Sequence, residues 1–254
     1  MDTYSRTSGD IDIWVEGSRE DIVDYVRSFV PNAYECYHHI DFPVFNDVAV
    51  EVHFTPTMLF NPYSNRKIQK FFKEQRSIQM EHKVAFDDKG NYICVPEQVF
   101  NAVFQMAHLK YHFFIEGVGL RQFIDYYYLL LQGFSDDEKY LVVNRVRQFG
   151  MLKFSKGVMW ILNSELWIDK KYLLIEPDGK VGRFMLNEIL EGGNFGHHDK
   201  RYETRKKGYL ARGIVDTIRL LKLARVFPTD AWWKIVNKIG NQKWRIRHKF
   251  LAFG

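Results

Sequence analysis

Near its start the chain carries two carboxylates one residue apart in "GDIDIWV", residues 9–15, a segment that otherwise resembles a buried strand. In an extended chain alternate side chains share a face, so Asp10 and Asp12 point one way while Ile11 and Ile13 point the other. Two like charges on one face repel each other and, unless neutralised, cost stability or take up protons. The segment therefore predicts a counter-charge beside it, either Arg or Lys side chains or a divalent cation.

A capped helix and a second acidic strand follow this segment. Ser18, three residues before Asp21, is a helix-capping signature, and apolar side chains then recur at helical spacing. The segment "DVAVEVHF", residues 47–54, alternates apolar and polar side chains and places Glu51 and His53 on its polar face. Carboxylates are the ligands that Mg²⁺ prefers, and three of them can hold the two ions used in phosphoryl or nucleotidyl transfer.

The rest of the sequence is mostly helical. A helix is predicted from about residue 65 to 75, a hairpin over 78–95, and helices from Pro96 onwards. Breaks between those helices are expected at 116–119, at 132–138 and near Gly150. The sequence thus predicts an α+β fold, with a mixed β-sheet and helices in residues 1–95 and an α-helical domain in residues 96–254.

Composition excludes several classes of protein. A chain of 254 residues that is 46% hydrophobic can bury a substantial core. The two cysteines, Cys36 and Cys94, lie far apart and show no metal-ligand spacing, and the N-terminus does not resemble a signal peptide. Because the longest apolar runs fall well short of the roughly 20 residues of a spanning helix, we expect no membrane span and a cytoplasmic location.

Positive charge is concentrated at the C-terminal end. Residues 200–254 contain 15 Lys and Arg against three acids, whereas residues 1–199 contain 21 against 28. Such a segment suits phosphate-rich partners such as nucleotide, nucleic acid or an anionic membrane surface. A helix docked on the acidic remainder, with its charges in solvent, explains the same pattern, and the sequence leaves both interpretations open.

Four segments resemble a known superfamily. "GDIDIWV" matches a strand with two alternating acids, and "VEVHF" matches the strand that carries a third acid. "HLKYHFFIEGVGLRQFIDYYYLL" and "EILEGGNFG" are similar to later segments. With these features the chain resembles the nucleotidyltransferase superfamily of DNA polymerase β and, within it, bacterial nucleotidyltransferase-like proteins of unassigned substrate.

This resemblance implies a two-metal, Mg²⁺- or Mn²⁺-dependent transferase. Asp10 and Asp12 would ligate metal, and Glu51 would complete the catalytic site and act as general base towards the acceptor hydroxyl. The reaction would move a nucleoside monophosphate from an NTP such as ATP to an unidentified hydroxyl or phosphate acceptor, releasing pyrophosphate. The alternative is a catalytically degenerate protein of the same fold that binds nucleic acid or a protein partner.

Five residues are candidates for nucleotide contacts: Arg6, Ser8, Gly9, His53 and Arg121. Arg6 precedes the first acidic strand and can reach a triphosphate, although a surface position fits equally well. Arg121 can hold a phosphate bidentately or form an intrahelical ion pair with Asp125. His53 shares a face with Glu51, where it can donate an orienting hydrogen bond.

The chain departs from the superfamily pattern before the first acid. The superfamily normally carries a Gly-Ser or Gly-Gly pair on a preceding helix, whose backbone and hydroxyl hold the triphosphate. Here nine residues precede Asp10, and they contain a single glycine, Gly9. Either the chain is the C-terminal part of a longer protein, without the N-terminal part of the fold, or it is a degenerate relative. A Gly-Ser pair encoded upstream would favour the enzyme.

Overall fold

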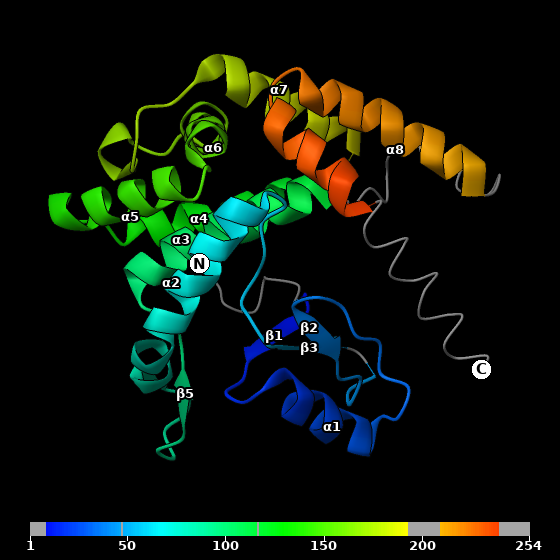
Figure 1. Cartoon of the computed structure of the whole chain (residues 1–254). Helices are drawn as coiled ribbons and strands as arrows, with labels where there is room; N and C mark the ends of the chain where they lie inside the picture. The colour runs from blue at the N-terminus through cyan, green and yellow to red at the C-terminus, as the bar shows by residue number, and fades with distance from the viewer. Residues whose placement is uncertain (1–8, 47, 116, 193–208, 239–254) are drawn as a thin grey trace. The chain divides into compact units, whose positions relative to one another are not determined.

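The chain divides into two compact units. The computed structural model describes residues 9–46, 48–115, 117–192 and 209–238 (Figure 1). The first unit is Met1–Met58 and the second is Leu59–Gly254. The boundary predicted near residue 95 lies inside the second of these units. The division into functional domains 1–95 and 96–254 stays a prediction.

The first unit contains a small mixed sheet. Its elements are β1 (Ile11–Trp14), α1 (Arg19–Phe29), β2 (His39–Asp41) and β3 (Val50–His53). The strand order is β1-β3-β2, with β1 parallel and β2 antiparallel to β3. The sheet is therefore mixed, as predicted, and the short strand β2 arises from a segment whose sequence gave no clear pattern.

Helix α1 covers one face of this sheet (Figure 1). It begins because the hydroxyl of Ser18 accepts a hydrogen bond from the Asp21 backbone N–H, which satisfies a donor that the helix leaves unpaired. Its apolar stripe, which includes Val26, packs on Ile40 and Val52 of the sheet. Since strand side chains alternate, Glu51 and His53 are directed to the opposite face.

Strand β1 is less buried than its sequence predicted. Ile11 and Ile13 are 44% and 43% exposed. Within the described part of this unit β1 pairs only with β3, so it forms an edge of the sheet, and an edge strand is covered less than a central one. The prediction of a fully buried strand was therefore wrong, although the alternation of faces is correct.

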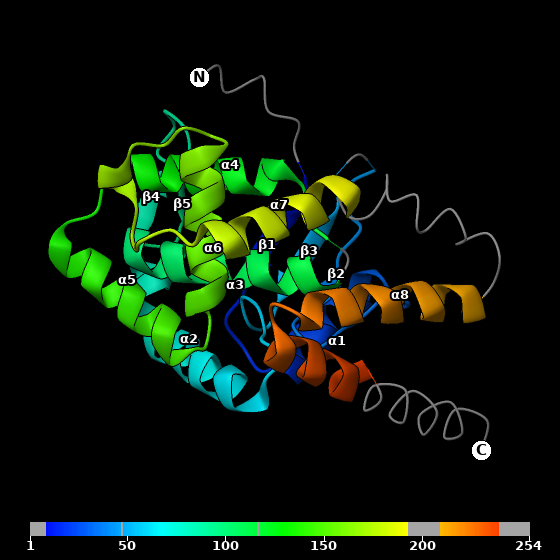
Figure 2. The same cartoon turned by 90° about the horizontal axis from the view of Figure 1, so that it is seen from above.

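The second unit is mainly helical (Figure 2). Its elements are α2 (Pro62–Glu81), β4 (Lys83–Ala85), β5 (Tyr92–Cys94), α3 (Gln98–Ile115), α4 (Leu120–Leu131), α5 (Asp136–Gln148), α6 (Leu152–Ser164), the 3₁₀ turn η2 (Lys170–Tyr172), α7 (Gly179–Gly192) and α8 (Tyr209–Ala224). Residues 228–238 are also helical. The breaks predicted between the four central helices are confirmed, and Ser135 and Glu138 form the capping box that starts α5.

Helix α2 is longer than predicted. The side chain of Asn61 accepts hydrogen bonds from the backbone N–H groups of Tyr63 and Ser64, so the helix begins at Pro62. It continues to Glu81, through residues that were predicted to start the hairpin. The hairpin itself is present, because β4 and β5 pair antiparallel over three residues each.

Helices α6 and α7 approach closely through two glycines. A Cβ on Gly157 would lie 2.8 Å from Val181 Cγ1 and closer still to the sulfur of Met185. A Cβ on Gly182 would overlap the side chain of Trp160. Larger residues at either position would push the two helices apart.

Part of the basic C-terminal segment is tied to its own unit by ion pairs. Arg219 Nε lies 2.9 Å from Glu188 Oε1, and both side chains are at most 5% exposed. Lys222 Nζ lies 3.0 Å from Glu188 Oε2, and Lys238 Nζ lies 2.9 Å from Asp216 Oδ2. These contacts favour the docked-helix interpretation for this part of the segment. Residues 193–208 and 239–254 lie outside the described residues, so binding of nucleic acid stays a prediction.

None of the described helices has both the length and the apolar composition needed to cross a membrane.

Candidate functional site

A row of three carboxylates crosses the first sheet. Asp12 on β1 pairs with Glu51 on β3, and Glu51 pairs in turn with Asp41 on β2. Side chains at paired positions share a face, so all three are directed away from the face covered by α1. In the next row of this face His53 pairs with His39.

The predicted three-carboxylate set comes together at this face. Asp10, Asp12 and Glu51 each offer an oxygen, and these oxygens lie within 4.8 Å of one another. The two aspartates are exposed and Glu51 is half-buried. The group is thus open to solvent on the aspartate side, where a cation and a soluble ligand could enter.

His53 lies between two of these carboxylates. Its Nε2 is 3.2 Å from Asp12 Oδ1 and 3.3 Å from Glu51 Oε2, and the residue is only 2% exposed. Burial alone would lower the pKa of this imidazole, but hydrogen bonds to Asp12 and Glu51 raise it to about 9. The hydrogen bond predicted for His53 is therefore present, and the ring is protonated at neutral pH.

His39, which the sequence analysis did not select, supplies a second imidazole. Its Nδ1 lies 3.0 Å from Glu51 Oε2, within ion-pair distance but outside hydrogen-bond geometry, and its Nε2 lies 3.4 Å from Asp41 Oδ1. Burial lowers its pKa, but contacts with Cys36 and Glu51 raise it to about 10. The one sequence feature that could have identified these residues is the spacing of His39 and Asp41, which are two residues apart. Nothing in the sequence placed their strand beside β3.

The sequence predicted Arg or Lys side chains or a divalent cation as the counter-charge, whereas in the structure histidines supply part of it. Burial by itself would raise the pKa of Glu51, but its contacts with the imidazoles of His39 and His53 hold it well below its usual range. Burial also raises the pKa of Asp41, which is only partly offset by His39. Two imidazolium groups thus partly balance four carboxylates, which leaves an excess of negative charge at this face.

The raised pKa of His53 predicts how stability changes with pH in metal-free protein. A histidine with a raised folded-state pKa contributes stability below its unfolded pKa of about 6.5, and that contribution disappears as the pH rises through about 9. We expect His53→Gln to cost the most unfolding free energy at and below about pH 6.5 and progressively less as the pH rises towards 9. Urea unfolding of both proteins in the presence of a chelator measures this difference, and parallel pH curves would contradict the prediction.

The other predicted site residues are less informative. Arg6 and Ser8 lie outside the described residues, and Gly9 is exposed just before β1. Arg121 lies on α4 in the second unit, where it and Asp125 are half-buried. Their predicted contacts with nucleotide stay predictions.

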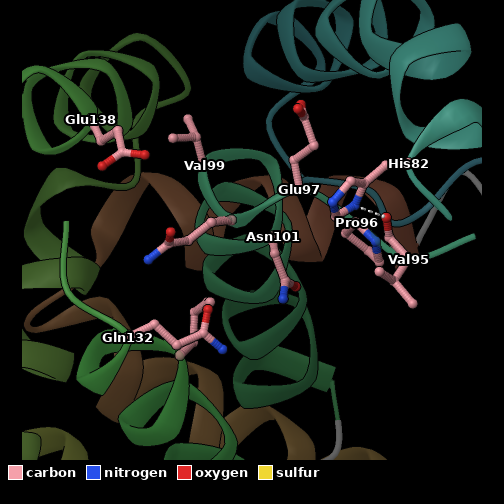
Figure 3. A pocket seen from close by; sticks show the side chains of 10 residues that line it. His82, Val95, Pro96, Glu97, Val99, Asn101, Gln132 and Glu138 are labelled. Atoms are coloured by element: carbon pink, nitrogen blue, oxygen red, sulfur yellow. Dashed lines mark hydrogen bonds between the residues drawn. The ribbon is translucent and has the colours of Figure 1, made fainter. Parts of the chain in front are cut away.

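A separate pocket lies within the second unit (Figure 3). It has a volume of about 520 Å³, and its labelled lining includes His82, Glu97, Asn101, Gln132 and Glu138. The ring of His82 is held at its rim by a contact of 2.8 Å between Nδ1 and the Val95 carbonyl. None of the site residues predicted from the sequence lines this pocket.

Comparison with known proteins agrees with the chemistry of the carboxylate face. Comparisons with curated proteins and with solved structures give no significant match. The model of a family described as "Uncharacterised nucleotidyltransferase" matches residues 1–166, which include every strand of the first unit and most helices of the second. Because this match covers well over half of the chain, the protein belongs to this family of uncharacterised nucleotidyltransferases.

Proposed function

We propose that the protein is a divalent-metal-dependent nucleotidyltransferase. It would transfer a nucleoside monophosphate from an NTP, such as ATP, to a hydroxyl or phosphate acceptor and release pyrophosphate. The observation that carries this proposal is the convergence of Asp10, Asp12 and Glu51, with ligand oxygens within 4.8 Å, in a chain of a nucleotidyltransferase family.

The donor set fits Mg²⁺ or Mn²⁺. Both are hard cations that prefer oxygen ligands, and Asp10, Asp12 and Glu51 offer only oxygens. A carboxylate has two oxygens, so Asp12 and Glu51 can each keep one in contact with His53 and present the other to a cation. The bound ion would neutralise charge on the phosphate oxygens during transfer.

The pKa values assign different roles to Glu51 and His53. An effective general base has a pKa near the working pH, whereas the pKa of Glu51 lies far below it. We therefore favour Glu51 as a metal ligand rather than as the base suggested by the family resemblance. His53, buried and bonded to both Asp12 and Glu51, would fix the orientation of these two ligands.

Contacts with the nucleotide are the least constrained part of the proposal. Arg121 can hold a phosphate bidentately, and Arg6, Ser8 and Gly9 precede the first carboxylate in sequence. The acceptor is left open, because hydroxyls of small molecules, sugars, proteins and RNA ends share the same reacting group. A panel that contains each acceptor class is therefore part of any activity test.

Metal binding tests the site directly. Glu51→Gln keeps the size of the side chain but removes its charge, so it should weaken Mn²⁺ binding by at least about tenfold. Titration calorimetry or the electron paramagnetic resonance signal of free Mn²⁺ measures this affinity. Glu16→Gln is the matched control, because Glu16 is an exposed residue in the turn after β1, and it should bind Mn²⁺ as the wild type does.

Pyrophosphate release measured on the same proteins connects binding with reaction. Wild type and Glu16→Gln should release pyrophosphate from an NTP in the presence of Mg²⁺ and the correct acceptor, and Glu51→Gln should not. Equal Mn²⁺ affinity in all three proteins would refute the proposed site. Metal binding without turnover across the acceptor panel would instead favour the catalytically degenerate alternative.

A further inference from the structure

A second group of metal-ligand side chains lies in the segment that leads into β2. Cys36, His38 and His39 each offer one ligand atom, and these atoms lie within 4.8 Å of one another. Cys36 Sγ is 3.6 Å from His38 Nδ1, and the rings of His38 and His39 are 4.6 Å apart. His38 is only 4% exposed, and Cys36 and His39 are half-buried. The sequence showed no metal-ligand spacing between the two cysteines, and the ligands that the fold brings beside Cys36 are instead the neighbouring histidines.

The backbone of this segment is held in place from both sides. Arg19 on α1 donates hydrogen bonds to the carbonyls of Cys36, at 2.8 Å, and of Tyr37, at 3.2 Å. The Cys36 N–H donates to the His39 carbonyl at 3.0 Å, and the Phe54 N–H, just after β3, donates to the His38 carbonyl at 2.8 Å. The three side chains are therefore positioned by the fold, so binding an ion needs little further ordering of the backbone.

One distance within the group agrees with a tetrahedral zinc site. Zn–S bonds of about 2.3 Å and Zn–N bonds of about 2.0 to 2.1 Å, at a tetrahedral angle, place sulfur and nitrogen about 3.5 Å apart. The Cys36 to His38 distance of 3.6 Å is close to this value. Thiolate and imidazole are ligands that suit zinc, whereas Mg²⁺ prefers oxygen.

The cysteine contacts both imidazoles. Burial would raise the pKa of the Cys36 thiol, but hydrogen bonds with His38 and His39 lower it to about 5. His39 adds a feature of zinc sites, since metal-bound histidines commonly hold a carboxylate with their other nitrogen. Its Nδ1 faces Glu51 and its Nε2 faces Asp41, so whichever nitrogen ligates the ion, the other still faces a carboxylate.

We propose that Cys36, His38 and His39 bind one zinc ion, at a site distinct from the carboxylate site and independent of the proposed nucleotidyl transfer. Three protein ligands leave a fourth tetrahedral position for water or for another ligand. Glu51, which contacts His39, lies between the two sites, so an ion at one of them changes the charge that surrounds the other.

Cobalt provides a direct probe, because a thiolate bound to Co²⁺ gives an intense near-ultraviolet absorption band. The metal-free full chain, kept reduced, should develop this band at one Co²⁺ per chain, lose it when Zn²⁺ is added and keep it in excess Mg²⁺. Cys36→Ser should abolish the band and weaken Zn²⁺ binding by at least about 100-fold. Absence of the band in the wild type, or its persistence in Cys36→Ser, would overturn the proposal.

The chain contains its own controls. Cys94 is its other cysteine, exposed on β5 in the second unit, and Cys94→Ser should keep the band. Asp12→Asn should keep it as well, which separates this site from the carboxylate site. In the wild type, Zn²⁺ should slow alkylation of Cys36 at least about tenfold relative to Cys94 in the same molecules, and this measurement needs no variant to fold. A ratio of the two alkylation rates that zinc leaves unchanged would also refute the site.

Discussion

Replacing Asp12 by Asn should lower pyrophosphate release from NTP and Mg²⁺ by about 10² to 10³-fold, the loss typical when one charge-stabilising group is removed from an active site. Asn keeps the shape of the side chain but provides one neutral oxygen in place of a carboxylate. Asp12 belongs to the group of oxygens within 4.8 Å and is also the partner of His53 Nε2. The change therefore affects both the proposed metal ion and the imidazole of His53, which orients the ligands of that ion.

The matched control is Asp24→Asn. Asp24 is exposed on α1, the helix that covers the opposite face of the sheet, so its replacement should leave activity unchanged. The loss in Asp12→Asn should appear in kcat more than in KM if metal ligation acts mainly in the transition state. Wild-type activity in Asp12→Asn would exclude the proposed centre. Inactivity of the wild type towards every NTP and acceptor tested would favour a binding protein instead.

The carboxylate site could be predicted from the sequence because strand periodicity is strict. Residues two apart in a strand lie on the same face of the sheet. Asp10 could therefore be grouped with Asp12, and Glu51 with His53, before the pairing of the strands was known. What brought the two groups together was the resemblance to a family, since periodicity alone does not say which strands are neighbours. The structure places β1 beside β3 in a register that sets Asp12 opposite Glu51.

His38, His39 and Cys36 were not predicted as ligands, because their proximity depends on strand pairing and on the fold of a loop. The strand that contains His39 is three residues long, and a short strand next to a loop has too few residues to show alternation. Its pairing with β3 sets His39 against His53, and this contact depends on residues far apart in the sequence. Cys36 and His38 lie in a loop that is fixed by Arg19 and by the end of β3, which no local pattern reveals.

Helical segments were predicted better than strands because their signals are local. Ser135 with Glu138 marks the start of α5 within four residues, and the glycines near 117, 133 and 150 mark helix ends. The error at the start of α2 arose because a proline can either interrupt a helix or begin one. The helix was predicted to start only at about residue 65, after Pro62, whereas a proline directly after the capping residue Asn61 is favourable in the first turn.

The second large effect is expected on stability, at the buried ion pair of the second unit. Arg219→Met should lower the free energy of unfolding by about 3 kcal/mol, the lower end of the range for breaking a buried ion pair, because the carboxylate of Glu188 loses its buried partner and keeps only Lys222. Arg219 also donates hydrogen bonds to the carbonyls of Phe113, at 2.5 Å, and Phe114, at 3.3 Å, near the C-terminal end of α3. The last carbonyls of a helix have no intrahelical partner, so the same substitution also removes a donor from Phe113, whereas the Phe114 carbonyl still accepts a hydrogen bond from Lys234 Nζ. Urea unfolding monitored by circular dichroism measures the loss.

Two comparisons distinguish the effect of breaking the buried ion pair from the effect of removing any positive charge. Lys238→Met removes a pair with Asp216 whose side chains are 44% and 39% exposed, so it should cost at most about 1 kcal/mol. The double variant Arg219→Met with Glu188→Leu should be more stable than Arg219→Met alone, because the buried carboxylate is then removed as well. Lys222 would keep Glu191, which lies 2.5 Å away, as its partner in that variant. A single Arg219→Met variant as stable as Lys238→Met would show that α8 does not depend on this pair for its packing against α7 and α3.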